Sequence, residues 1–267
     1  MAWNPDTYNK FKSERYQPYY DLVSHIEKEP HQKIIDLGCG TGELTKFLAE
    51  TFEDATVLGI DTSAEMLAKA PERTNLSFEQ KSIEKQVSEK QKWDVIFSNA
   101  ALQWADDHDK LFSELISLLA PNGQLAVQMP SQTENILNKI LLQLVQEKPY
   151  SEALHNWKRL SPVLPIEHYT TLFFEKGGKN FQIYEKVYPI IAQTADALYE
   201  FISGSALIPY MERLDEELQY SLTQEFKRRI AAAFPKMPAV YAFKRIILYA
   251  RFQFTQSDKV LLNKKDK

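Results

Sequence analysis

The stretch of residues 34–42 constrains the fold more than any other part of this chain. It joins a short apolar run, Ile-Ile-Asp-Leu, to a turn in which every second residue is glycine. Glycine allows backbone angles that other residues avoid, and it leaves no side chain between the backbone and a ligand. Apolar residues then return at helical spacing, at Leu44, Phe47 and Leu48. The stretch therefore predicts a strand, a ligand-binding turn and the start of a helix.

Glu43 argues against one common use of such a turn. A dinucleotide-binding fingerprint places its third glycine three residues after the second, and that position is Glu43 here. A carboxylate at that point would lie near the pyrophosphate of NAD or FAD. A nicotinamide-dependent oxidoreductase is therefore only an alternative hypothesis, from another class of enzyme.

A second predicted strand, residues 56–61, ends in Asp61. An acid at the carboxyl end of such a strand can accept hydrogen bonds from both hydroxyls of a ribose. Thr62 and Glu65 have the spacing of a capping box, which predicts that the next helix begins at this point. Met66, in the first turn of that helix, can lie against an adenine ring.

Asp36 with its glycines, and Gly59-Ile60-Asp61 after them, resemble motifs I and II of the class I S-adenosylmethionine-dependent methyltransferases. In that class an acid usually binds the adenine amino group at the position of Ser82, with an apolar neighbour against the ring. Ser82 or Glu84 would replace that acid here, and Ile83 is the apolar neighbour. The resemblance implies S-adenosyl-L-methionine as the cofactor and contacts from these residues: Asp36, Gly38, Cys39, Gly40, Gly42, Asp61, Thr62, Met66, Ser82, Ile83 and Asn99.

The order of predicted strands and helices indicates an α/β fold. Further strands are expected at residues 76–79, 93–99, 124–129, 181–188 and 243–252. Helices are expected between them, including one that begins at Asp109 and others at residues 134–148 and 194–234, and a turn is expected at residues 121–123. Five strands that alternate with helices, followed by two strands around a helical insertion, match the Rossmann-like class I methyltransferase sheet of seven strands. In that sheet the last strand is antiparallel.

With 267 residues, of which 44% are hydrophobic, the chain can form one large domain with a substantial core. We expect a single methyltransferase domain at residues 1–254 and a disordered tail at residues 255–267. Residues 21–130 are the expected cofactor-binding core, and residues 131–170 and 194–238 are the expected helical cover of the substrate. Residues 1–20 are an expected helical N-terminal lid, in which Tyr8, Phe11 and Arg15 close over the cofactor.

Charge, cysteine content and hydropathy argue against several other classes. The net charge is −4 and no block dense in Lys and Arg occurs before the last few residues, so no nucleic-acid partner is expected. The single cysteine, Cys39, rules out an internal disulfide and suits a cytoplasmic protein. No apolar run approaches the roughly 18 residues that span a bilayer, and no hydrophobic signal region is found, so no membrane partner is expected.

The histidines give no indication of a metal site. All five are scattered along the sequence and none is paired with a cysteine, so we expect them at the surface and expect no bound metal. The sequence does not indicate an oligomeric state, and a monomer is compatible with it.

Four runs narrow the resemblance to one family: Trp3-Asn4-Pro5-x-x-Tyr8, the stretch from Asn99 to His108, the stretch from Leu125 to Pro130, and Phe243-Lys244-Arg245. They resemble the trans-aconitate 2-methyltransferases, over residues 2–252. The malonyl-carrier-protein methyltransferases of biotin synthesis also have Gln-Trp after the fourth strand, and they are an alternative, as is a cofactor-binding protein without catalysis. The chain departs from the family pattern at Ser82 and in residues 150–165.

The resemblance implies methylation of a carboxylate of a small polycarboxylic acid, such as trans-aconitate, to give a methyl ester. A carboxylate with an unperturbed pKa of about 4 is ionised at neutral pH, so it needs no general base. We therefore expect no catalytic residue, only residues that position the two reactants. An antiparallel final strand would begin at the carboxyl edge of the sheet, where a guanidinium can grip a carboxylate. The expected substrate-binding residues are Tyr8, Phe11, Arg15, Gln103, Trp104, Arg159 and Arg245.

Overall fold

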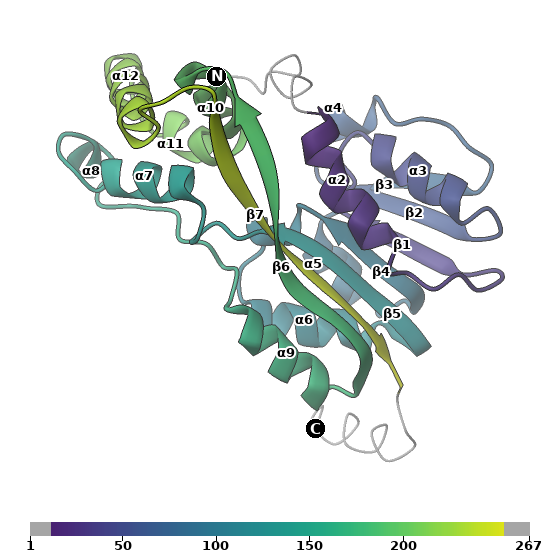
Figure 1. Ribbon diagram of the computed structural model, residues 1–267. Coiled ribbons are helices and arrows are strands. Elements are labelled where there is room, and N and C mark those ends of the chain that lie inside the picture. Colours follow the sequence, from purple (N-terminus) through teal and green to yellow (C-terminus); the bar gives the residue numbers. More distant parts are fainter. Residues whose placement is uncertain (1–11, 254–267) are drawn as a thin grey trace. The chain divides into compact units, whose positions relative to one another are not determined.

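The computed structural model describes the backbone of residues 12–253 and the side chains from residue 16 onward (Figure 1). Tyr8, Phe11, the side chain of Arg15 and the tail at residues 255–267 lie outside this description. The described chain forms two compact units. Unit 1 contains Ser131–Ser161 and Val187–Arg245, and unit 2 contains Tyr19–Pro130, Pro162–Lys186 and the chain from Ile246 onward. The prediction of a single domain with cover segments stays a prediction.

Unit 2 is built on parallel strands that lie side by side in Figure 1. The strand order of the sheet is β3-β2-β1-β4-β5-β7-β6. Neighbouring pairs among the first five strands of this order are parallel. Their bounds are β1 (Lys33–Leu37), β2 (Thr56–Asp61), β3 (Leu76–Gln80), β4 (Trp93–Asn99) and β5 (Leu119–Pro130).

β6 (Gly178–Ala192) and β7 (Ala239–Phe252) complete the sheet, and each passes from one unit into the other. β7 is antiparallel to β5, because Tyr249 contacts Gln124 whereas Arg251 contacts Asn122. The N–H of Gln253 also donates to the carbonyl of Gly177, so the end of β7 meets the start of β6. The predicted fold class, a seven-stranded sheet with an antiparallel last strand, is confirmed.

Both faces of the parallel sheet are buried because consecutive strand residues point to opposite sides. On β1, Ile34 belongs to one apolar core and Ile35 to another. The first core contains apolar residues of α2 (Lys12–Val23) and α3 (Glu43–Thr51), which cover one face. The second contains apolar residues of α6 (His108–Ser117) and α9 (Ile166–Glu175), on the other face.

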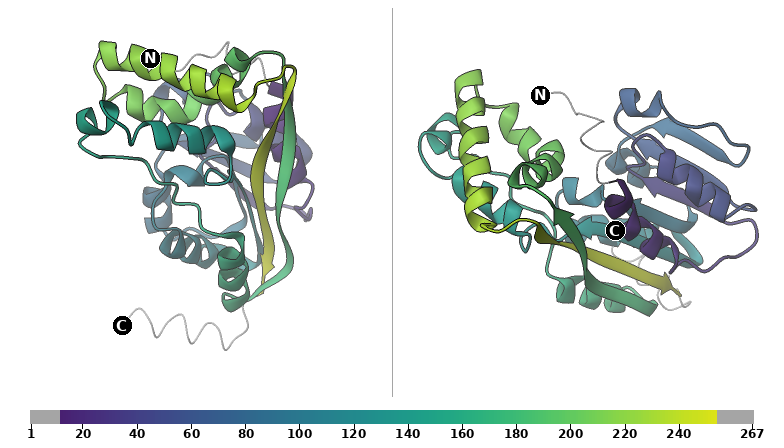
Figure 2. Two further views of the ribbon diagram at one scale, coloured as in Figure 1. Left: turned by 60° about the vertical axis from the view of Figure 1, so that its left-hand side comes forward. Right: turned by 45° about the horizontal axis from the view of Figure 1, so that its top comes forward.

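Unit 1 has a separate apolar core formed by helices and the adjoining ends of β6 and β7 (Figure 2). Leu222, Phe226 and Ile230 of α12 are fully buried there together with Leu137 of α7 and Leu198 of α10. The helices of this unit are α7 (Ile136–Leu144), α8 (Tyr150–Ala153), α10 (Ala195–Ile202), η2 (Ser203–Leu207), α11 (Ile208–Met211) and α12 (Glu216–Ala233).

The structure corrects the expected bounds of three elements. The helix after β2 is α4 (Ala64–Leu67), and its N-cap is Ser63 rather than Thr62, because the Ser63 hydroxyl accepts the N–H of Met66 at 3.2 Å. α6 begins at His108 after an Asp107 cap, one residue before the expected start at Asp109. The expected turn at residues 121–123 lies within β5, where a bulge separates two parts of its pairing with β4.

No helix in the described chain is long and apolar enough to cross a membrane. Likewise, no group of three or more His, Cys, Asp and Glu side chains in this part of the chain could hold a metal ion.

Asn75 gives a test of how α3 ends. Its side-chain amide nitrogen lies 3.1 Å from the carbonyl oxygen of Ala49, 3.3 Å from that of Phe52 and 3.0 Å from that of Ala55. We expect Asn75→Ala to lower the free energy of unfolding by about 1–3 kcal/mol, because carbonyl groups at the end of α3 lose their donor. Urea denaturation measures this. Arg73→Ala, next to it, should cost less than half as much, and equal losses would contradict the assignment.

Candidate cofactor and substrate site

The three glycines of the turn after β1 have positive φ angles: 76° at Gly38, 58° at Gly40 and 71° at Gly42. A Cβ atom on Gly38 would lie only 2.3 Å from the Cβ of Ala101, in the segment after β4. A Cβ on Gly40 would meet nothing closer than the Met66 sulfur at 3.8 Å. Gly38 therefore allows two turns to pack together, whereas Gly40 borders open space that a ligand can enter.

The N–H groups of these glycines already have partners inside the protein. Those of Gly38 and Cys39 both donate to the Ile60 carbonyl at 2.9 Å, and that of Gly42 donates to the Cys39 carbonyl at 3.0 Å. The N–H of Gly40 donates to the Asp61 carboxylate at 2.9 Å. The turn therefore allows a ligand to approach the backbone closely, but its glycine N–H groups are already hydrogen-bonded within the protein. They are not the free donors that a ligand-binding turn would lead one to expect.

Asp61 is a fixed, half-buried acceptor at the carboxyl end of β2. One carboxylate oxygen accepts the Gly40 N–H, and the other accepts the N–H of Ser63 at 2.9 Å. Each oxygen of an ionised carboxylate has a second lone pair, so this side chain can still accept two hydroxyl groups. Because both bonds are to backbone, the carboxylate is held in one orientation before any ligand arrives.

Asp36 is placed differently from Asp61, since it is buried beneath the turn. Its carboxylate accepts the hydroxyl of Thr45 at 2.6 Å, which fastens α3 to β1. Burial raises the pKa of Asp36 to about 7, and the nearby charge of Asp61 adds to this, although the Thr45 hydrogen bond opposes it. Burial likewise raises the pKa of the Cys39 thiol. Asp36 therefore supports the turn from inside and does not line open space.

The expected adenine corner is formed by α4 and by α5 (Ile83–Ser88). Met66 and Ile83 are half-buried, whereas Thr62 and Glu84 are exposed. Ser82 is the N-cap of α5, where its hydroxyl accepts the N–H of Lys85 at 3.2 Å. One lone pair of the Ser82 oxygen is thus used for the cap, and the hydroxyl hydrogen and the other lone pair are left for a ligand.

Asn99 carries a clear sign of a binding site at the end of β4. Its side-chain oxygen is buried and has no hydrogen-bond partner among the residues that the structure describes. Buried polar atoms are nearly always paired, so an exception of this kind calls for an explanation such as a ligand. The position, at the carboxyl edge of a parallel sheet, is where ligands of α/β folds bind.

Gln103 and Trp104 lie on η1 (Leu102–Trp104), the short helix that follows β4, and they face different surroundings. Gln103 is buried, and its side-chain nitrogen donates to the carbonyl of Ala100 at 2.6 Å. Trp104 is 42% exposed. The structure thus gives Gln103 a role in shaping the segment after β4, and the part of Trp104 in the substrate site stays a prediction.

Arg159 and Arg245 both belong to unit 1, whereas the glycine turn belongs to unit 2. Arg245 is buried, with its guanidinium carbon 4.2 Å from the centre of the Phe243 ring. Arg159 is half-buried, and its backbone N–H donates to the hydroxyl of Tyr210 at 3.2 Å. Both arginines therefore have aromatic neighbours within their own unit.

The expectation that His108 lies at the surface was wrong. Its side chain is buried, with only 2% exposed. Both of its ring nitrogens have partners in unit 2, Tyr169 and the carbonyl of Leu102. The one sequence signal for a special role is its place at the end of the run that starts at Asn99.

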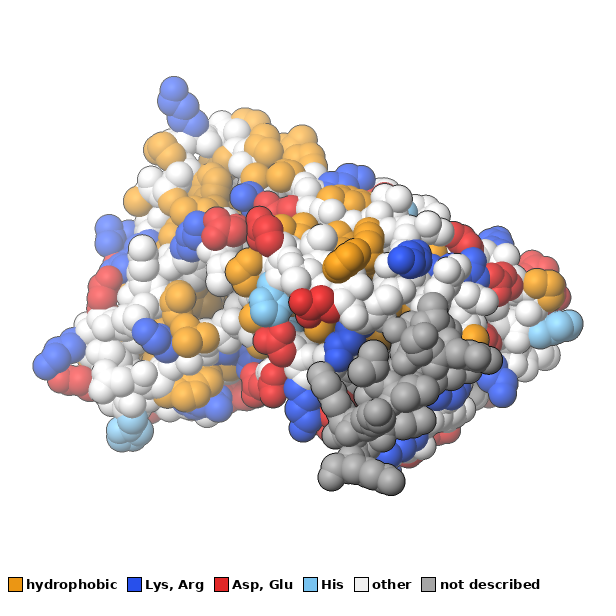
Figure 3. Space-filling view, turned by 90° about the horizontal axis from the view of Figure 1, so that it is seen from below, with side chains coloured by type: hydrophobic (Ala, Val, Ile, Leu, Met, Phe, Trp, Pro, Cys, Tyr) orange, Lys and Arg blue, Asp and Glu red, His pale blue; other side chains and the backbone are white. Residues whose placement is uncertain are grey.

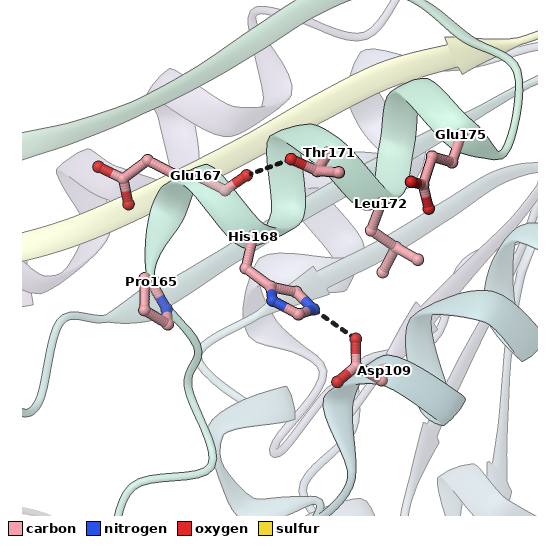
Figure 4. Close-up of a pocket in the computed structure, with 7 residues that line it drawn as sticks. All are labelled: Asp109, Pro165, Glu167, His168, Thr171, Leu172 and Glu175. Carbon is pink, nitrogen blue, oxygen red and sulfur yellow. Dashed lines mark hydrogen bonds and ion pairs between the residues drawn. The ribbon is translucent and has the colours of Figure 1, made fainter.

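A separate hollow of about 570 Å³ lies on unit 2 (Figure 4). Figure 4 shows His168 of α9 pointing toward Asp109 of α6, with which it forms an ion pair. None of the predicted site residues whose side chains are described lines it. Its lining residues are Asp109, Pro165, Glu167, His168, Thr171, Leu172 and Glu175. On the described part of the face in Figure 3, acidic and basic side chains are interspersed.

Comparison with known proteins identifies the family. A family profile described as "Methyltransferase domain" matches residues 28–188. A trans-aconitate 2-methyltransferase of Deinococcus radiodurans is 38% identical over 258 residues, which cover 94% of this chain and 98% of that protein. The chain belongs to the trans-aconitate 2-methyltransferase family. A second member, from Variovorax paradoxus, is 34% identical over 256 residues, with the same coverage of both chains.

Solved structures support the fold. The YcgJ protein of Bacillus subtilis matches with a TM-score of 0.54 and 13% identity, over 90% of this chain and all of that one. Phosphoethanolamine N-methyltransferase 2 of Haemonchus contortus, in complex with S-adenosyl-L-methionine, matches with a TM-score of 0.52 and 17% identity. That match covers 89% of this chain and 52% of the other. Family membership confirms the predictions of a methyltransferase and of S-adenosylmethionine as its cofactor.

Two glycine substitutions separate packing from ligand access. Alanine at a positive φ costs about 1–2 kcal/mol at either position, and Gly38→Ala adds the collision with Ala101. We expect Gly38→Ala to be the less stable variant in urea denaturation. Gly40→Ala should keep more of the stability yet weaken S-adenosylhomocysteine binding by about tenfold or more, measured by calorimetry, because its methyl group enters the open space. Unchanged affinity in Gly40→Ala would place the ligand elsewhere.

Asp36 predicts a distinctive pH dependence of stability. Its pKa is about 7 in the folded protein and about 4 in an unfolded chain. Between these values the folded state keeps a proton that the unfolded state has lost, so the free energy of unfolding falls as pH rises and levels off above about 7. Asp36→Asn lacks this group but can still accept the Thr45 hydroxyl. Urea denaturation at several pH values should therefore show a smaller decline for the variant, and parallel curves would contradict the raised pKa.

Proposed function

We propose that this enzyme transfers the methyl group of S-adenosylmethionine to one carboxylate of a small polycarboxylic acid such as trans-aconitate. The observation that carries the proposal is the likeness to trans-aconitate 2-methyltransferases at 34–38% identity over 94% of the chain. None of the relatives named above is named for a carrier-protein substrate or for a nicotinamide cofactor. The cytoplasmic location and the lid residues Tyr8, Phe11 and Arg15 stay predictions.

The residues of unit 2 fit the parts of an S-adenosyl group. Asp61 is a fixed acceptor suited to the ribose hydroxyls, and Met66 and Ile83 are half-buried apolar side chains suited to the adenine ring. Gly40 leaves room for close approach, and the unpartnered oxygen of Asn99 is suited to the ammonium group of the methionine end. When bound, S-adenosylmethionine supplies a methyl group made electrophilic by its sulfonium.

The transfer needs no proton movement. A carboxylate oxygen of the acid forms the new bond to the methyl carbon while the carbon–sulfur bond breaks, and the electron pair of that bond stays on sulfur. The acid, with a pKa of about 4, is already ionised at neutral pH. The protein therefore contributes alignment and exclusion of water, for which well-oriented sites supply roughly 7–11 kcal/mol. Trp104 of unit 2 is the proposed wall beside the acid. Guanidinium groups can hold the carboxylates that do not react, and Arg245 and Arg159 are the proposed residues for this.

The experiment that tests the function is methyl transfer from labelled S-adenosylmethionine to a panel of small polycarboxylates, with a malonyl carrier protein as the competing acceptor. We expect a base-labile methyl ester on trans-aconitate or a close analogue. Label found on the carrier protein alone would replace the proposed substrate. Binding of S-adenosylhomocysteine without turnover on any acceptor would indicate a binding protein.

Arg245→Ala tests the proposed grip on the substrate. We expect KM for trans-aconitate to rise about ten- to hundredfold, as for the loss of one charge-assisted contact, with unchanged affinity for S-adenosylhomocysteine. Arg213→Ala is the matched control, because Arg213 also stacks on an aromatic ring, that of Trp157 at 3.9 Å, but is exposed. An unchanged KM in Arg245→Ala would remove Arg245 from the site. An equal loss of cofactor affinity would show a structural role.

A further inference from the structure

His108 has no role in the chemistry described so far, although it is a buried titratable group close to η1. It is the first residue of α6, and its ring lies 5.4 Å from that of Phe112, centre to centre. Its Nδ1 atom lies 2.5 Å from the hydroxyl of Tyr169 on α9, and its Nε2 atom lies 3.0 Å from the carbonyl oxygen of Leu102. One imidazole ring thus joins α9 to the first residue of η1.

The partners of Tyr169 and His108 determine which atoms in this series of hydrogen bonds carry the hydrogens. The carbonyl of Leu102 can only accept, so Nε2 carries a hydrogen. The hydroxyl of Tyr169 accepts the N–H of Leu164 at 3.0 Å, which leaves its own hydrogen for Nδ1. Nδ1 can accept that hydrogen only when the ring is neutral. All three hydrogen bonds are therefore made together by one tautomer of neutral His108.

Electrostatics agree with the neutral ring. Burial lowers the pKa of His108, and this outweighs the opposing effects of the carbonyls of Leu102 and Ala105 and of the Asp106 and Asp109 carboxylates. On the outer side of the same pair of helices, Asp109 pairs with His168 (Figure 4). Tyr169, which faces His108 from α9, has its own pKa raised by burial and so stays protonated as a donor.

The far end of this chain of hydrogen bonds is the segment that lines the proposed site. Leu102 is followed directly by Gln103 and Trp104, and Ala101 before it contacts Gly38 of the glycine turn. Two backbone hydrogen bonds lie within this segment: the N–H of Trp104 donates to the carbonyl of Ala101, and that of Ala105 donates to the carbonyl of Leu102. An apolar residue could fill the space of the imidazole, but it could not hold the Leu102 carbonyl.

We propose that His108 is a positioning residue, which holds the Leu102 carbonyl and thereby fixes η1 so that Trp104 keeps its place beside the methyl acceptor. Tyr169 and the N–H of Leu164 hold the imidazole in the tautomer that can do this. The effect on substrate rests on the proposed function, whereas the effect on η1 does not.

The first test needs no substrate. His108→Phe removes both hydrogen bonds, and we expect amide hydrogen exchange in residues 100–106 to become about five- to tenfold faster, with no change in β2. His108→Gln keeps an N–H that can reach the Leu102 carbonyl and should restore most of the protection. Unchanged exchange at residues 100–106 in His108→Phe, or a uniform increase over the whole of unit 2, would overturn the proposal.

The second test separates positioning from stability. In His108→Phe, KM for trans-aconitate should rise about five- to twentyfold while the affinity for S-adenosylhomocysteine changes less than twofold. Tyr169→Phe should shift KM in the same direction but less. Tyr249→Phe is the matched control, since it also removes a buried hydroxyl in unit 2, one that donates to Gln124 at 2.8 Å. It should lower the melting temperature without changing KM.

The outcomes distinguish this inference from the proposed function. If the wild type methylates no acid, the proposed substrate fails and the exchange experiment still decides on His108. If the wild type methylates trans-aconitate but His108→Phe has a lower melting temperature with unchanged KM, His108 is a structural residue. Should His108→Phe not fold, Tyr169→Phe, which removes only the hydroxyl that orients the imidazole, gives the same two readouts with smaller expected changes.

Discussion

The site depends on the way in which the turn after β1 is bound to the end of β2. The Ile60 carbonyl takes two N–H groups of the turn, and the Asp61 carboxylate takes a third, that of Gly40. These bonds draw the turn onto the neighbouring strand, and they satisfy backbone groups that would otherwise be left unpaired at a buried edge. The same bonds hold Asp61 in place, so a single local structure both forms the turn and orients the carboxylate that we propose accepts the ribose hydroxyls.

The two carboxylates near this turn, Asp61 and Asp36, differ in role because their surroundings differ. Asp61 is half-buried and meets only backbone donors, whereas Asp36 is enclosed and has Thr45 as its partner. Burial raises the pKa of Asp36, and the nearby charge of Asp61 adds to this. A cationic group bound close to Asp36 would act in the opposite direction on its pKa.

Local signals in the sequence predicted much of the fold and the shape of the glycine turn, whereas the contacts to the cofactor stay predictions. The glycine turn, the acid that ends β2 and the order of the strands each depend on a few adjacent residues, and the structure has them where they were expected. Errors of one residue at Thr62 and Asp109 arose because Ser, Thr and Asp can all cap a helix, and neighbouring positions offered two choices. The bulge in β5 replaced a turn because pairing with β4 overrides local turn preference.

The burial of His108 could not be predicted, because its partner Tyr169 lies 61 residues away in the chain. The inward orientation of the Gln103 amide depends in the same way on the path of the backbone at Ala100, which has a positive φ of 57°. The division of β6 and β7 between two units is likewise a property of the whole contact pattern rather than of any short run. Sequence periodicity specifies which residues are apolar, but it does not specify which distant polar group will be their neighbour.

The rate of a methyl transfer to an ionised carboxylate depends strongly on contacts of this kind, between residues far apart in the sequence. With no proton to move, the rate depends on how well the acceptor oxygen is aligned with the methyl group, and small displacements of the surrounding side chains are costly. η1 is a single short turn, too short to be stable by itself, so its position must be fixed by other elements. In our proposal, the hydrogen bonds from Leu164 through Tyr169 and His108 to Leu102 supply that restraint from the buried side of η1, while Trp104 lies on its exposed side.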